Sequence, residues 1–132
     1  MASELRVNTL KDASGNNSVA TSVVFNGTAK AWLNYNDHTP ATIDSFNVSS
    51  INDEAAGKFK PSWTSIFSNA NYSATGSHAE DNGLYSNFGA GSRMSWFNSS
   101  RTTALVYGAS EVVGSGFTDM RTVEGHFIGD LA

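Results

Sequence analysis

The chain has no cysteine, only two prolines and few charged side chains among its 132 residues. Without cysteine no disulfide can form, so stability must come from a core or from association of subunits, and folding in a reducing cytosol is favoured. Charged residues make up 15% of the chain, and its eight lysines and arginines are dispersed along it. Because phosphate contacts require clustered cations, nucleic acid is not an expected partner.

Long hydrophobic runs and long helix-forming windows are also missing. The residues after Met1 show no basic segment followed by an apolar run, and no later stretch approaches the length of a membrane span. The sequence therefore predicts neither a secretory signal nor membrane insertion. The one candidate helix, Asp53–Gly57, is too short to form without packing. A length of 132 residues fits one domain.

The abundant residues are Ser, Thr, Asn and Gly, a composition that favours strands and turns. Apolar and polar side chains alternate with a period of two in Ala29–Tyr35, Lys58–Trp63 and Ser92–Phe97, which indicates strands with one buried face. Further strands are expected at Glu4–Leu10, Val19–Phe25, Ser45–Ile51, Tyr72–Gly76, Thr102–Tyr107, Phe117–Val123 and His126–Ile128.

Turn residues separate these strands. Asn26-Gly27 predicts a tight hairpin from Val19–Phe25 into Thr28–Tyr35, because both turn positions tolerate positive φ, although Gly27 could instead be a simple loop break. Asn36–Pro40 predicts a second turn, and Pro61 indicates an edge strand or a bulge because it cannot donate to a ladder. The last strand is expected to pair centrally.

The pattern predicts an all-β fold, an antiparallel β-sandwich or jelly-roll-like barrel. Residues 1–17 are expected to form a short N-terminal arm, and residues 18–132 the β-sandwich domain. The arm is only weakly hydrophobic, so it could not bury itself alone. Its candidate contact residues are Leu5, Val7 and Leu10.

Catalytic and metal-binding patterns do not stand out. The sequence contains no Gly-X-Ser-X-Gly, and its histidines are scattered without metal-ligand spacing. His78 beside Glu80 and Asp81 could bind a cation, but such residues in a solvated loop are more often simply hydrophilic. The sequence thus predicts no enzyme, cofactor or metal. The tryptophans could stack on sugar rings, although their positions in strands favour core packing for at least two of them.

The stretch Ser77–Gly91 has no periodicity and is dense in turn residues. Long loops of this kind tend to be functional, so this one is the leading candidate for a recognition surface, and a second loop is expected at Gly108–Gly116. The alternative is that the apolar side chains of Ser77–Gly91 pin it to the core. The candidate recognition residues are His78, Asp81, Tyr85 and Phe88, with Tyr85 preferred over any tryptophan for ligand contact.

Two segments carry a family resemblance: KAWLNYN, residues 30–36, and IDSFNVSSINDEAAGKFKPSWTSIFSNANYSATGS, residues 43–77. Their order and spacing resemble a module that recurs in tail-fibre and other virion proteins of bacteriophages, notably marine, cyanophage-like ones. The opening SELRVNTLKDASGNNSV, residues 3–19, is similar to the start of such proteins. The resemblance covers roughly residues 3–77.

The resemblance implies a virion protein made in the cytoplasm of the host bacterium. Because fibre proteins are commonly homotrimers, it implies that the N-terminal arm attaches the subunit to other virion proteins or drives trimerisation, whereas the plain alternative is an edge strand. The expected function is a non-enzymatic tail-fibre or tail-tip module that binds a host-surface glycan or protein. The alternatives are a head-decoration or capsid-spike protein, or a small carbohydrate-binding domain.

Overall fold

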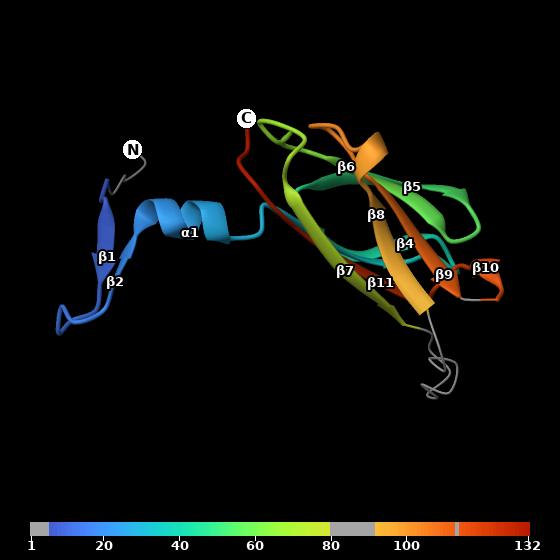
Figure 1. Ribbon diagram of the computed structural model, residues 1–132, viewed down its shortest axis with the longest axis horizontal. Helices are drawn as coiled ribbons and strands as arrows, with labels where there is room; N and C mark the ends of the chain where they lie inside the picture. Colours follow the sequence, from blue (N-terminus) through green and yellow to red (C-terminus); the bar gives the residue numbers. More distant parts are fainter. Residues whose placement is uncertain (1–5, 80–91, 113) are drawn as a thin grey trace.

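The computed structural model describes residues 6–79, 92–112 and 114–132. Two antiparallel sheets pack face to face, which confirms the predicted all-β sandwich (Figure 1). The four-stranded sheet contains, in spatial order, β4 (Ala41–Phe46), β3 (Ala31–Asn36), β11 (Thr122–Ile128) and β7 (Ser73–Ala79). The five-stranded sheet contains β5 (Val48–Ala55), β6 (Lys58–Trp63), β9 (Tyr107–Val112), β8 (Ser92–Phe97) and β10 (Gly116–Phe117).

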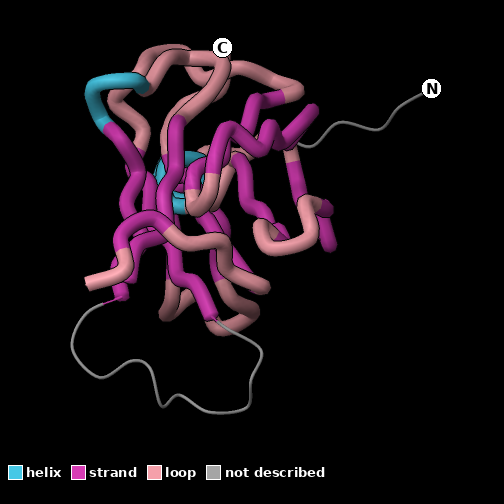
Figure 2. The backbone as a smooth tube through the Cα atoms, turned by 90° about the vertical axis from the view of Figure 1, so that its right-hand side faces the viewer, coloured by secondary structure: helices cyan, strands magenta, loops and turns pink. Residues whose placement is uncertain are grey.

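The last long strand, β11, lies between β3 and β7, so its predicted central pairing is confirmed. In the five-stranded sheet, β9 pairs with β8 along one edge and with both β6 and β10 along the other. Figure 2 views the sandwich from the end away from the N-terminal segment and shows most of its strands running close to one direction. A short 3-10 helix, η2 (Asn98–Ser100), follows β8.

The chain passes from one sheet to the other at Asn47, between β4 and β5. Asn47 has φ 58°, a left-handed conformation that asparagine tolerates better than most residues. Its amide nitrogen donates to the carbonyl oxygens of Lys30 and Ser65, each at 3.0 Å, and its amide oxygen accepts from the Ser65 N–H. The single strand predicted at Ser45–Ile51 is therefore wrong, because this corner divides it between the two sheets.

The N-terminal segment differs from the prediction. Strand β1 (Thr9–Lys11) pairs with β2 (Ser18–Ala20) in a two-stranded sheet, and the seven-residue helix α1 (Thr21–Gly27) follows. The strand predicted at Val19–Phe25 and its hairpin at Asn26-Gly27 are wrong. Only Val19 and Ala20 pair with a neighbouring strand, and from Thr21 onward the backbone groups bond within a helical turn instead. In Figure 1 this segment lies beside the sandwich rather than within it.

Two predictions about the second half of the chain are also wrong. Thr102 Oγ1 accepts the N–H groups of Ala104 and Leu105, which closes a turn where Thr102–Tyr107 was expected to be a strand. Strand β9 begins only at Tyr107 and occupies most of the loop predicted at Gly108–Gly116.

Two predictions in the β5–β6 hairpin are corrected as well. The candidate helix Asp53–Gly57 is the end of β5 and its turn. Pro61 does not lie on an edge strand, because β6 has β5 on one side and β9 on the other. The named ladder between β6 and β9 covers only Lys58 and Phe59, and beyond it Pro61 accepts from the Val106 N–H at 3.2 Å without donating in return. The missing N–H thus falls where the ladder gives way to an isolated bridge between Ser62 and Leu105.

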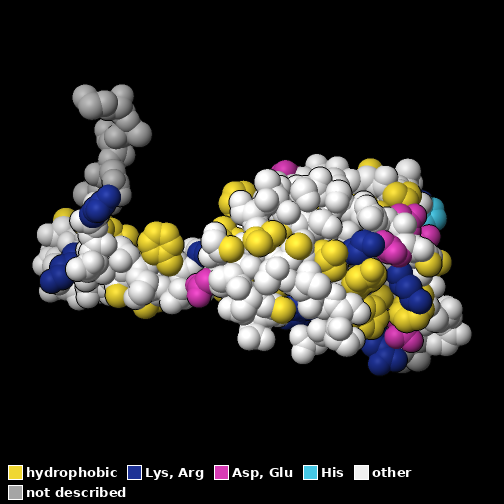
Figure 3. Space-filling view, turned by 90° about the horizontal axis from the view of Figure 1, so that it is seen from above, with side chains coloured by type: hydrophobic (Ala, Val, Ile, Leu, Met, Phe, Trp, Pro, Cys, Tyr) yellow, Lys and Arg dark blue, Asp and Glu magenta, His cyan; other side chains and the backbone are white. Residues whose placement is uncertain are grey.

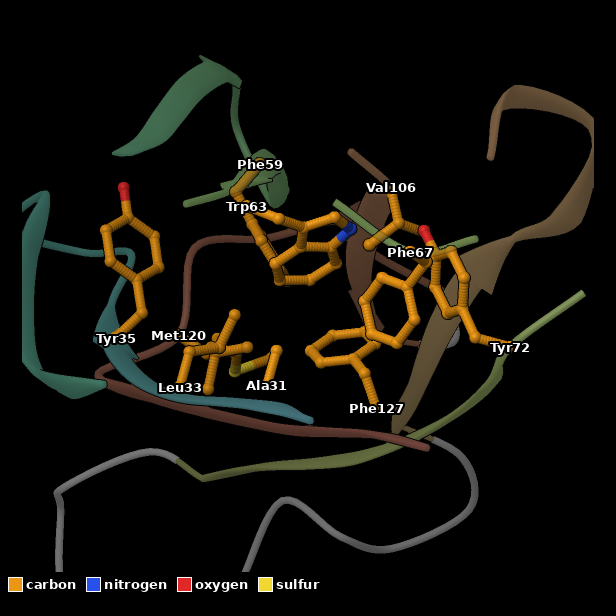
Figure 4. Packing of buried hydrophobic residues seen from close by; sticks show 11 residues of the cluster. Ala31, Leu33, Tyr35, Phe59, Trp63, Phe67, Tyr72, Val106, Met120 and Phe127 are labelled. Atoms are coloured by element: carbon orange, nitrogen blue, oxygen red, sulfur yellow. The ribbon is translucent and has the colours of Figure 1, made fainter. Parts of the chain in front are cut away.

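A continuous group of aromatic rings fills the space between the sheets (Figure 4). Phe127 of β11 contacts Trp63 of β6, with ring centroids 4.6 Å apart, and Trp96 of β8, with centroids 4.8 Å apart. Phe67 stacks on Tyr72 at 4.1 Å. The prediction that at least two tryptophans pack in the core is therefore confirmed by Trp63 and Trp96.

The ring of Trp96 requires glycine on the opposite sheet. Gly76 and Gly125 are paired in register, and a side chain on either would overlap the indole of Trp96. The two glycines thus leave room on the four-stranded sheet for the Trp96 ring. They are needed here for close approach of the two layers and not for a turn.

We expect Phe127→Ala to lower the free energy of unfolding by about 3–5 kcal/mol, because it removes a fully buried ring that contacts both core tryptophans. Chemical denaturation of the full chain measures this loss. Phe46→Ala is the matched control, since Phe46 is 53% exposed and its removal is expected to cost less than about 1 kcal/mol. Equal losses for the two variants would contradict the assignment of the core.

Candidate functional site

The outer face of the four-stranded sheet carries two rows of side chains that cross the strands. Residues that pair directly in an antiparallel ladder share a face, and Trp32 pairs with Phe46 on one side and with His126 on the other. In the next row, Asn34 pairs with Asp44 and with Glu124. We call these six residues the outer face: an aromatic row of Phe46, Trp32 and His126, and a polar row of Asp44, Asn34 and Glu124.

The strict alternation of β3 creates this arrangement. Ala31, Leu33 and Tyr35 are buried against the other sheet, which turns Trp32 and Asn34 away from the core. Trp32 and Asn34 are half-buried, whereas Asp44, Phe46, Glu124 and His126 are exposed. The outer face is therefore open to solvent and held on a rigid sheet.

Hydrogen bonds fix part of the polar row. Ser77 of β7 pairs with Glu124 of β11, and its hydroxyl group donates to Glu124 Oε2 at 2.9 Å. Asp44 accepts the backbone N–H of Ser45 at 2.8 Å. The amide oxygen of Asn34 is buried and has no hydrogen-bond partner. The row can thus accept hydrogen bonds from a ligand at its two exposed carboxylates, whereas the oxygen of Asn34 is reached only when a side chain moves.

The exposed face of the five-stranded sheet has a different character. The ammonium group of Lys58 lies 4.3 Å from the ring centroid of Phe117, and that of Lys60 lies 5.2 Å from the ring centroid of Tyr107. Arg93 pairs with Glu111 at 3.0 Å. Figure 3 shows cationic, acidic and hydrophobic side chains intermingled on the sandwich. Its cations already have partners within the chain, so this face is a weaker candidate for a ligand.

The predicted recognition residues do not form this site. His78 lies within β7, not in a loop, and pairs with Val123, which places it on the core side of the sheet. Asp81, Tyr85 and Phe88 lie outside the described residues.

Of the candidate arm contacts, Leu5 also lies outside the described residues, while Val7 is 39% and Leu10 46% exposed. The expected recognition by the loop and the expected arm therefore stay predictions.

A buried carboxyl group lies at the end of β3. Asp37 is 1% exposed, and neither of its carboxylate oxygens has a hydrogen-bond partner. Its backbone N–H donates to the carbonyl oxygen of Met120 at 2.9 Å, which holds the turn against the segment before β11. The hydroxyl of Tyr35 is also buried without a partner.

Burial, followed by the charges of Asp119 and Asp53, raises the pKa of Asp37 to about 7. Burial, followed by the same acidic neighbours and Asp37 itself, also raises the pKa of Tyr35 to about 12. No three His, Cys, Asp or Glu side chains are arranged to hold a metal ion in the described part of the chain. Within that same part, no helix is long and apolar enough to cross a membrane.

Comparison of the chain with protein family models, with curated proteins and with solved structures gives no match. The assignment of function therefore depends on the geometry of the outer face and on the order of the sequence motifs.

Asp37→Asn should alter how stability depends on pH. Because the pKa of Asp37 is raised from 3.8 to about 7, the folded state holds its proton more tightly, and stability falls as pH rises from about 4 to 7. Each unit of pKa difference corresponds to about 1.4 kcal/mol, so the fall amounts to a few kcal/mol. We expect the free energy of unfolding of the variant not to fall over this pH range, so that the variant is more stable than the wild type at pH 8.

Thermal unfolding followed at several pH values between 4 and 8 measures the effect. Asp130→Asn is the control, because it removes an exposed carboxylate of the same type. Equal pH dependence in the wild type and Asp37→Asn would show that Asp37 is not the titrating group.

Proposed function

We propose that this chain is a non-enzymatic structural protein of a bacteriophage virion, a tail-fibre or tail-tip module that binds the host surface through the outer face. The observation that carries this proposal is the uncovered sheet face with an aromatic row beside a row of hydrogen-bond acceptors. Exposed aromatic side chains on a rigid scaffold supply contact area at low entropic cost. The resemblance of residues 3–77 to tail-fibre modules supports the virion setting, with synthesis in the host cytoplasm.

Adsorption to whole cells tests this function. The purified chain, displayed on fluorescent multivalent particles, is mixed with a panel of cultured bacteria that includes marine cyanobacteria. We expect binding to some strains and not to others, and a loss of at least tenfold for Trp32→Ala, since several weak contacts act together on a multivalent particle. Phe117→Ala is the matched control, because Phe117 is an exposed aromatic residue, 42% accessible, on the other sheet.

Binding to no strain, or equal binding by Trp32→Ala and the wild type, would contradict the proposal. Release of soluble sugar from the bound cells would contradict its non-enzymatic part. If phage particles carry the protein on the head instead of the tail, the alternative of a head-decoration or capsid-spike protein takes its place.

The N-terminal segment supports a role in self-association. No described residue before Ala31 is buried, and α1 exposes Val23, Val24 and Phe25, the last by 68%. A two-stranded sheet and a seven-residue helix are marginal on their own. The segment is tied to the sandwich at Lys30, whose ammonium group donates to the carbonyl oxygen of Phe25 and to Thr28 Oγ1. We propose that equivalent segments pack together in a homotrimer and against other virion proteins.

Light scattering tests this arrangement. We expect the full chain to have the mass of a trimer, and both deletion of residues 1–17 and Phe25→Ser to shift it toward the monomer, because each removes apolar surface from the contact. Phe117→Ser is the control, since it changes an exposed phenylalanine on the sandwich. A stable trimer after the deletion, or a monomeric full chain, would contradict this part of the proposal.

A further inference from the structure

We infer that the ligand of the outer face is a neutral glycan, whose sugar ring stacks on Trp32 while its hydroxyl groups bond to the polar row. This inference rests on the proposed function and adds the chemical class of the ligand. It is drawn from the order of side chains in the two rows, their charge and their hydrogen bonding.

The aromatic row suits the apolar face of a sugar. The C–H groups on one side of a pyranose ring form a flat hydrophobic patch that packs on an aromatic ring. Trp32 occupies the middle strand of the row, and its neighbours in register, Phe46 and His126, extend the platform on both sides. Because Trp32 is half-buried, its ring is supported by the sheet and presents only part of its surface.

The polar row suits hydroxyl groups. Hydroxyls donate hydrogen bonds, and Asp44, Asn34 and Glu124 offer acceptor oxygens in one line beside the aromatic row. The exposed carboxylates of Asp44 and Glu124, the latter held in place by Ser77, are acceptors that a ligand can reach directly. The buried amide oxygen of Asn34 lacks a partner, which is costly, and a small movement of its side chain toward solvent would let a ligand donor satisfy it.

Charge narrows the class of ligand. Neither row contains a lysine or arginine, and both ends of the polar row are carboxylates. Lys30, two residues before Trp32 in the sequence, uses its ammonium group to hold the end of α1. An anionic glycan would therefore face repulsion without compensation, whereas a neutral one would not. A protein partner fits less well, because the centres of protein interfaces are depleted of Asp and Glu.

The test is a glycan array probed with the full chain displayed multivalently. The array carries neutral oligosaccharides of glucose, galactose, mannose and N-acetylglucosamine, together with sialylated and sulfated ones. We expect binding to members of the neutral set only. Binding should fall at least tenfold for Trp32→Ala and severalfold for Asn34→Ala, and it should be retained in part by Trp32→Phe, which keeps a ring.

Phe117→Ala should bind like the wild type, and circular dichroism checks that each variant is folded. Binding only to sialylated or sulfated glycans, or to none, would overturn the inference. So would neutral binding that Trp32→Ala leaves unchanged. If the array is negative while whole cells still bind through Trp32, and protease treatment of the cells abolishes that binding, the ligand is a protein; the proposed function then survives and only this inference fails.

Discussion

The contact of Phe127 with Trp63 and Trp96 is the interaction on which the sandwich depends. The chain has little apolar material, 39% of its residues, and much of its strand surface is polar. A few large rings must therefore fill the space between the layers, and they do so from β11 on one side and from β6 and β8 on the other. Because the inner face supplies this packing, the outer face of the four-stranded sheet is free to carry polar and aromatic residues.

Several elements follow directly from the sequence. The period of two in Lys58–Trp63 and Ser92–Phe97 predicts β6 and β8 with the bounds that the structure shows. The same period in Ala29–Tyr35 predicts the burial of Leu33 and Tyr35 in β3. These strands are predictable because one face is consistently apolar, which fixes the orientation of every side chain. The contrast between apolar and polar faces is weak in Tyr107–Val112, so the sequence predicts a loop over most of the residues that form β9.

Other features depend on tertiary contacts that no local pattern contains. Val19–Phe25 alternates like a strand, yet only Val19 and Ala20 pair with a neighbour and the rest forms α1. The bend at Asn47 becomes intelligible only when its side chain is seen to bind Lys30 and Ser65, which are distant in sequence. Likewise, nothing local indicates that Asp37 is buried, because its burial comes from the segment before β11.

The outer face was missed for the same reason. The alternation of β3 indicated that Trp32 lies opposite the buried residues, and that was the available signal. The row itself also needs Phe46 and His126, and their alignment follows from the register of three strands that the sequence does not specify. A sheet surface assembled in this way differs from a loop site, because its spacing is fixed by the ladders and not by one flexible segment.

The central proposal is that the four-stranded sheet has one face that packs against the core and one face that binds a ligand. Hydroxyl-radical footprinting of the full chain, free and bound to cells that it recognises, tests this claim without knowledge of the receptor. The account predicts that Trp32, Phe46 and His126 become protected on binding while Phe97 and Phe117, on the other sheet, react as before. Protection of Phe97 and Phe117 with Trp32 unchanged would contradict it and would move the binding surface to the five-stranded sheet.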